Sequence, residues 1–167
     1  MRTALHSVIA FVMLAASTSA LASAPVNMEE APVGDFSFTT RNGVNTTLSA
    51  ELSKLAPETV VRVLFFDPDC GECKGVIFLV SSDTELSEDI AKGEAAVIAI
   101  YPTAGVPEPD DPDMQRYLRE APNLPESWIV GTDNGSVFDT DACTWDVLPQ
   151  LYIFKAGAPL RKPASEE

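Results

Sequence analysis

Histidine is almost absent from this chain, and basic residues are few. His6 is the single histidine among 167 residues, and 11 Lys and Arg stand against 25 Asp and Glu, which gives a net charge of −14. Once His6 is lost with the leader described below, Ser-His-Asp catalysis, Cys-His catalysis and histidine metal ligation are all excluded. The strong negative charge argues against nucleic acid and against anionic membrane surfaces as partners.

Long apolar runs are also missing, except near the N-terminus. Arg2 precedes the apolar stretch 4–16, and the small residues around Ala22 form a cleavage motif, so a secretory signal peptide is predicted over 1–22. The apolar stretch is shorter than the roughly 20 residues that a membrane-spanning helix needs. We therefore expect cleavage after Ala22 and a soluble mature protein that is periplasmic or secreted.

The remaining 145 residues, which follow the 22 of the signal peptide, are enough for one compact domain with one hydrophobic core. Segment 23–34 is rich in small residues and proline, and we expect it to be a flexible leader. The alternating and apolar segments that predict regular structure all lie within 35–162, which we take as the domain. Residues 163–167 are expected to be a frayed tail.

Several segments of the domain predict β-strands. Two alternating segments flank Asn42-Gly43, a strong signal for a β-hairpin. The runs 60–66 and 95–101 are almost continuously apolar, which is typical of strands buried on both faces. Short strands are also expected at 128–130 and at 151–154, the latter followed by a hairpin turn at Ala156-Gly157.

Helical patterns alternate with these strands. The segment after the 60–66 strand has apolar residues at positions i, i+3, i+4 and i+7, namely Cys73, Val76, Ile77 and Val80. A second helix is expected next, with residues 82–85 as a capping box and Gly93 as its C-terminal cap. A third is expected to begin at Pro112. Strands alternating with helices indicate an α/β protein whose sheet has a parallel centre and antiparallel edges.

Cys70 and Cys73 lie just after the predicted strand 60–66 and open the predicted helix. Unpaired backbone N–H groups and the helix dipole favour a thiolate at this helix start, and the thiolate is the nucleophile in thiol–disulfide exchange. The spacing places Cys73 one turn further on, close enough to form a disulfide. We therefore expect Cys70 to react with the partner and Cys73 to resolve the mixed disulfide.

Other uses of this cysteine pair stay open at this point. A structural zinc site needs four ligands, and Cys143 is the only further cysteine, so we expect no metal. An inert disulfide and a pair of buried apolar thiols are the other two. The order strand, CxxC, helix is typical of redox proteins and favours exchange. Cys143 itself is expected to be a small buried apolar residue.

Several segments resemble a known superfamily. The segment VRVLFFDPDCGECK, which ends at Lys74, resembles the strand and active-site turn of the thioredoxin superfamily, and GDFSFTTRNGVNTTLS resembles the leading hairpin of its periplasmic TlpA-like branch. More closely, FFDPDCGECK, AVIAIYP, LPESWIVGTD and LPQLYIF are similar, in that order, to a secreted bacterial thioredoxin-like family of uncharacterised function with a PDC-x-x-C turn. The resemblance implies a thioredoxin-like fold, with a mixed central sheet flanked by helices and an N-terminal β-hairpin.

The resemblance also implies roles for particular residues. Pro149 corresponds to the cis-proline that faces the disulfide, and Leu148 would present its backbone to an extended partner peptide. Two positions depart from related patterns. Leu64 stands where thioredoxins carry a buried acid, so no proton acceptor for Cys73 is identified. Asp67 stands where peroxiredoxins carry a threonine, which argues against peroxidase activity.

Together these features predict an extracytoplasmic thiol–disulfide oxidoreductase without a cofactor. Its partners would be protein thiols and disulfides, with a membrane redox donor as a further partner. Asp67, Asp69 and Glu72 oppose a very stable thiolate at Cys70, which predicts a reductant or thiol carrier. The alternative is a binding module that keeps the fold while the Cys70–Cys73 disulfide stays static.

Overall fold

The structure is a computed structural model, and it describes residues 27–67, 70–102, 124–133, 135–137 and 148–161. The predicted signal peptide, the helix predicted at Pro112, Cys143 and the tail 163–167 lie outside these ranges. Within them, no helix has the length and apolar character needed to cross a membrane.

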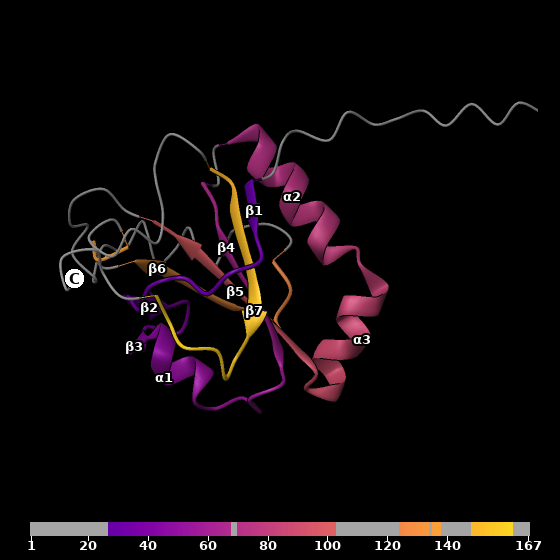
Figure 1. The fold of residues 1–167 in the computed structure, drawn as a ribbon. Coiled ribbons are helices and arrows are strands. Elements are labelled where there is room, and N and C mark those ends of the chain that lie inside the picture. The colour runs from indigo at the N-terminus through magenta and orange to yellow at the C-terminus, as the bar shows by residue number, and fades with distance from the viewer. Residues whose placement is uncertain (1–26, 68–69, 103–123, 134, 138–147, 162–167) are drawn as a thin grey trace, which may run out of the picture.

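A single mixed sheet forms the centre of the domain, with strand order β1-β7-β4-β5-β6-β2-β3 (Figure 1). β4, β5 and β6 are mutually parallel, β7 runs antiparallel to β4, and β2 runs antiparallel to both β6 and β3. The parallel centre and the N-terminal hairpin were predicted. The strands are β1 (Asn27–Glu29), β2 (Ser37–Thr40), β3 (Asn45–Thr47), β4 (Val60–Phe65), β5 (Ala95–Tyr101), β6 (Ile129–Asp133) and β7 (Gln150–Lys155).

The two central strands are buried on both faces, which explains their continuous apolar sequences. Val63 and Phe65 of β4 pack into one hydrophobic cluster, while Leu64 between them packs into the other. Ile98 and Val97 of β5 are divided in the same way. Since successive strand residues point to opposite faces, a strand between two cores must be apolar throughout.

Helices cover both faces of the sheet (Figure 1). α2 (Gly71–Ser81) and α3 (Thr84–Lys92) lie on the face of Leu64, and the short α1 (Leu48–Leu52) lies on the other. We expected the strand alternation to continue through Leu48, but β3 ends at Thr47. The Thr47 hydroxyl caps α1 by accepting the Ala50 N–H at 3.1 Å, and Leu48 turns inward to be fully buried.

The junction of α2 and α3 corrects one predicted cap. The Ser82 hydroxyl donates to the Phe78 carbonyl at 2.6 Å, so it belongs to the end of α2. Asp83, one residue later, is the N-cap of α3, and its Oδ1 accepts the Leu86 N–H at 3.0 Å. Gly93 ends α3 in the left-handed conformation with φ 78°, as predicted.

The segment expected to be a flexible leader joins the sheet from residue 27 onward. β1 pairs in parallel with β7, and Val33 is buried in the core. Gly34 forms a bridge to Arg161, whose guanidinium also pairs with Glu29 at 3.0 Å. The domain therefore starts before residue 35, because β7 still had an open edge able to pair with another strand.

The hairpin predicted after β7 does not form within the described residues. The chain turns at Ala156-Gly157, but their N–H groups donate to the carbonyls of Thr59 and Pro57, both at 2.9 Å. The turn is thus held against the segment that precedes β4. β1 occupies the edge beside β7 where the returning strand was expected.

Two glycines on these elements should respond oppositely to alanine. A Cβ on Gly131 would lie 2.6 Å from the Thr39 carbonyl oxygen, whereas a Cβ on Gly75 in α2 meets nothing within 4 Å. We expect Gly131→Ala to lower the free energy of unfolding by about 1–3 kcal/mol through overpacking. Gly75→Ala should raise it by about 0.5–1 kcal/mol through helix propensity. Urea denaturation of both variants checks this pair, and a loss of stability in Gly75→Ala would contradict the open space seen there.

Candidate active site

Cys70 and Cys73 form a disulfide at the start of α2, just beyond the end of β4. Cys70 is the N-cap of the helix, and its Sγ accepts the Cys73 N–H at 3.0 Å. Cys70 is half-buried, while Cys73 is fully buried in the cluster that contains Leu64 and Trp128. A partner sulfur can therefore approach Cys70 but not Cys73.

The buried sulfur has a main-chain partner. The Asp67 N–H donates to Cys73 Sγ over an N···S distance of 3.3 Å. Leu64, at the position expected from related proteins to hold an acid, is fully buried and apolar. A hydrogen bond to the charged form stabilises that form, so this N–H favours negative charge on Cys73 when the disulfide opens.

Glu72 brings a carboxylate to the exposed sulfur. Its Oε2 lies 3.8 Å from Cys70 Sγ. A disulfide sulfur carries no hydrogen, so this distance records proximity and not a hydrogen bond. After reduction the carboxylate would repel a Cys70 thiolate, while the Cys73 N–H would stabilise it. The site thus contains opposing electrostatic influences within one helical turn.

Leu148 and Pro149 lie at the same edge of the sheet as the cysteines. The ladder between β4 and β7 ends with Phe65 opposite Gln150, so the residues after Phe65 and those before Gln150 leave the sheet together. The Leu148–Pro149 peptide bond is cis, as the resemblance implied. Leu148 packs against the same hydrophobic cluster as Cys70.

With the fold and this geometry described, similarity to known proteins can be stated. No model of a protein family matches the sequence, and no curated protein sequence matches it. Solved structures do match. A thioredoxin-like protein from Bacteroides caccae has 21% identity and a TM-score of 0.60, over 81% of this chain and 45% of that chain.

Two further structures match over most of both chains. The thioredoxin domain of a thiol-disulfide oxidoreductase from Bacteroides vulgatus has 9% identity and a TM-score of 0.53, over 80% of this chain and 86% of that one. The exposed lipoprotein thioredoxin Etrx1 from Streptococcus pneumoniae has 15% identity and a TM-score of 0.51, over 77% and 87%. The chain is therefore a thioredoxin-fold protein, as predicted.

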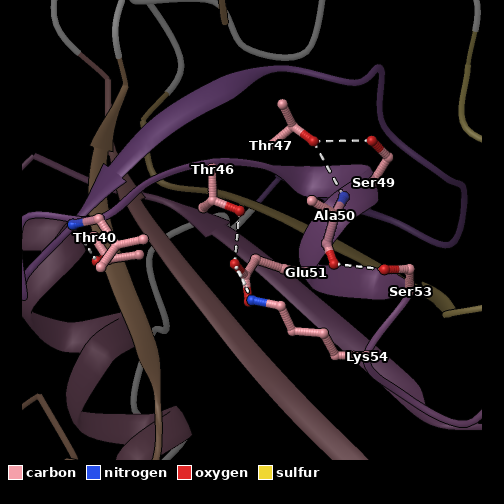
Figure 2. A network of polar contacts seen from close by, with 9 residues as sticks. Thr40, Thr46, Thr47, Ser49, Ala50, Glu51, Ser53 and Lys54 are labelled. Carbon is pink, nitrogen blue, oxygen red and sulfur yellow. Dashed lines mark hydrogen bonds and ion pairs between the residues drawn. The ribbon is translucent and has the colours of Figure 1, made fainter.

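Two buried carboxylates away from the cysteines were not singled out from the sequence. Glu51 of α1 accepts hydrogen bonds from the Thr46 hydroxyl and from Lys54 Nζ, both at 2.7 Å, and so ties α1 to β3 (Figure 2). Burial alone would raise the pKa of Glu51, but the hydrogen bonds from Lys54 and Thr46 and the Lys54 charge lower it. No feature of the sequence distinguishes Glu51 from the exposed acids.

Asp133, at the end of β6, is the second buried carboxylate. Its Oδ1 accepts the backbone N–H groups of Ser136 and Val137 at 3.0 and 3.2 Å, which closes the turn predicted at residues 133–136. Burial raises the pKa of Asp133, and these hydrogen bonds offset the shift only in part. The turn also touches β2, because the Ser136 hydroxyl accepts the Ser37 N–H at 3.0 Å.

These opposite pKa shifts predict opposite pH profiles. The carboxyl of Asp133 holds its proton more tightly when folded, so its contribution to stability is complete below pH 3.8 and is lost as pH rises through the raised pKa. Glu51 contributes above pH 4.5 and loses its contribution as pH falls through the lowered pKa.

Replacement by the neutral amide isolates each profile. We expect Asp133→Asn to become progressively more stable relative to the unmodified chain as pH rises from 3.5 to 7. Glu51→Gln should become progressively less stable over the same range. Urea denaturation at several pH values measures both differences, and two parallel curves would rule out both assignments.

Proposed function

We propose that this chain is a thiol–disulfide oxidoreductase that acts outside the cytoplasm. The observation that carries the proposal is the unequal exposure of the disulfide: Cys70 is accessible at a helix N-terminus, and Cys73 is buried directly behind it. A structural disulfide needs no such asymmetry, whereas exchange needs one sulfur for the partner and one for resolution. The similar structure from Bacteroides vulgatus, described as a thiol-disulfide oxidoreductase domain, supports this reading.

The reaction follows from the two sulfur environments. In the dithiol form, the Cys70 thiolate attacks one sulfur of a partner disulfide, and the second partner sulfur leaves as a thiolate and takes a proton. The Cys73 thiolate, stabilised by the Asp67 N–H, then attacks Cys70 Sγ and releases the first partner thiol. Two electrons pass from Cys70 and Cys73 to the partner, and the protein disulfide forms. We propose that the backbone at Leu148 and Pro149 holds the partner chain in place.

The direction we propose is that of a reductant or thiol carrier. A strong oxidant needs a very stable nucleophilic thiolate, because that stabilises its reduced form. The Glu72 carboxylate, 3.8 Å from Cys70 Sγ, opposes this stabilisation. The resulting disulfide is comparatively favoured, so the dithiol form tends to donate electrons.

The extracytoplasmic location rests on two supports. The first 22 residues have the pattern of a secretory signal peptide. The similar structure from Streptococcus pneumoniae is described as an exposed lipoprotein. Outside the cytoplasm a reductant has to be recharged, so a membrane redox donor is part of the proposal.

The reduction potential of the Cys70–Cys73 pair tests the activity. After equilibration with glutathione or dithiothreitol buffers and trapping of free thiols, we expect a value between roughly −120 and −270 mV, toward the negative end. A value well below about −300 mV, where structural disulfides lie, would favour the binding module with a static disulfide.

The role of Glu72 is tested by charge removal. In a Cys73→Ser background, Glu72→Gln should speed alkylation of Cys70 by iodoacetamide at pH 7 by about two- to fivefold, because less repulsion leaves more thiolate. Glu85→Gln removes an equal charge from exposed α3 and is the matched control, expected to change the rate little. Equal rates for both variants would mean that Glu72 does not set the reactivity of Cys70.

A further inference from the structure

Two large apolar side chains are exposed on the helix that begins at Cys70. Phe78 and Leu79 of α2 are 68% and 58% exposed, whereas the neighbouring Val76 and Ile77 are buried. Single exposed apolar residues are ordinary on protein surfaces, but a contiguous patch marks an interaction site more often. Within the described residues, the remaining large exposed apolar side chain is Val44, in the turn between β2 and β3.

The exposed pair is continuous with the reactive cysteine along the outer face of α2. At 3.6 residues per turn, Gly71, Gly75 and Phe78 follow one another on the side opposite the buried Cys73, and Leu79 lies beside them. The distance along the axis from Cys70 to Phe78 is about 12 Å, at 1.5 Å per residue. A protein that presents a disulfide to Cys70 would therefore lie over Phe78 and Leu79.

The two glycines have no explanation inside the domain. A Cβ on either Gly71 or Gly75 meets nothing within 4 Å, and glycine costs helix stability. An incoming chain that approaches the helix backbone closely would give their missing side chains a use.

The charges around the patch select the occupant. α2 has one cation, Lys74, and the exposed acids Glu72, Asp83 and Glu85 surround the patch at both ends of the helix. With a net charge of −14, a second copy of this chain and an anionic lipid surface would both be repelled. Charge complementarity favours a basic protein segment.

We propose that Gly71, Gly75, Phe78 and Leu79 form a docking surface for a partner protein whose redox cysteine is followed or preceded by an aliphatic side chain and flanked by Lys or Arg. The aliphatic side chain packs on Phe78 and Leu79, and the basic residues face Glu72 and Glu85. The inference rests on the proposed exchange activity, and it adds the recognition that exchange with small disulfides does not need.

A disulfide-linked peptide dimer is the probe. Each half carries one cysteine, a leucine four residues away on either side, and two lysines, since four extended residues at about 3.3 Å each span the distance to Phe78. One control peptide has serine for leucine, and another has glutamate for lysine. Each reaction converts the dithiol of the protein to the Cys70–Cys73 disulfide and the peptide disulfide to two thiols, so two electrons and two protons pass.

The rate of dithiol oxidation is followed for three full-length mature proteins: the unmodified chain, the double variant F78S/L79S, and the control V44S. We expect the unmodified chain and V44S to react about three- to tenfold faster with the leucine–lysine peptide than with either control peptide. F78S/L79S should lose that preference. All three should react equally with glutathione disulfide, because that molecule cannot reach Phe78.

Each other outcome overturns a defined statement. A preference retained by F78S/L79S, or equal rates for the lysine and glutamate peptides, overturns the docking surface and leaves the exchange activity standing. Sedimentation of the unmodified chain as a dimer and of F78S/L79S as a monomer would assign the patch to a second copy. Absence of reaction with glutathione disulfide overturns the exchange activity and the docking surface together.

Discussion

The pairing of β4 with β5 on one side and β7 on the other is the constraint on which the site depends. β4 lies between two hydrophobic clusters, so its residues cannot turn to water on either face. This burial fixes the point where the chain leaves the sheet, and Cys70 follows that point directly. Because β7 runs antiparallel to β4, the same pairing brings Leu148 and Pro149 to the edge where the disulfide lies.

The chemistry of the site then depends on where each sulfur sits relative to the first turn of α2. Cys70 is at the N-cap, where a helix N–H supports negative charge and Glu72 opposes it. Cys73 is one turn further in, surrounded by apolar side chains and touched by the Asp67 N–H. A main-chain donor cannot be removed by a side-chain substitution, so it can support the buried sulfur even where Leu64 takes the place of an acid.

The outer face of α2 adds recognition to this chemistry. A buried disulfide partner has to align with Cys70, and the energy for alignment must come from contacts away from the reacting atoms. Phe78 and Leu79 offer apolar area for this purpose, and the acidic surroundings restrict it to basic partners. On this view, α2 presents the nucleophile at its first residue and the recognition surface in its later turns.

The amino-acid sequence by itself predicted the elements whose signals are local. The apolar runs gave β4 and β5, Asn42-Gly43 gave the hairpin, and the position of Cys70 after a buried strand gave the redox site, because periodicity and turn chemistry are read over a few neighbouring residues. Tertiary structure decided what depends on distant partners. Residues 27–29 became β1 because β7 had an open edge, Ala156-Gly157 turned toward Pro57 and Thr59 instead of forming a hairpin, and Asp133 and Glu51 became buried because other segments closed over them. These outcomes arise from contacts between segments more than 100 residues apart in sequence or from burial, and neither is encoded in a local pattern.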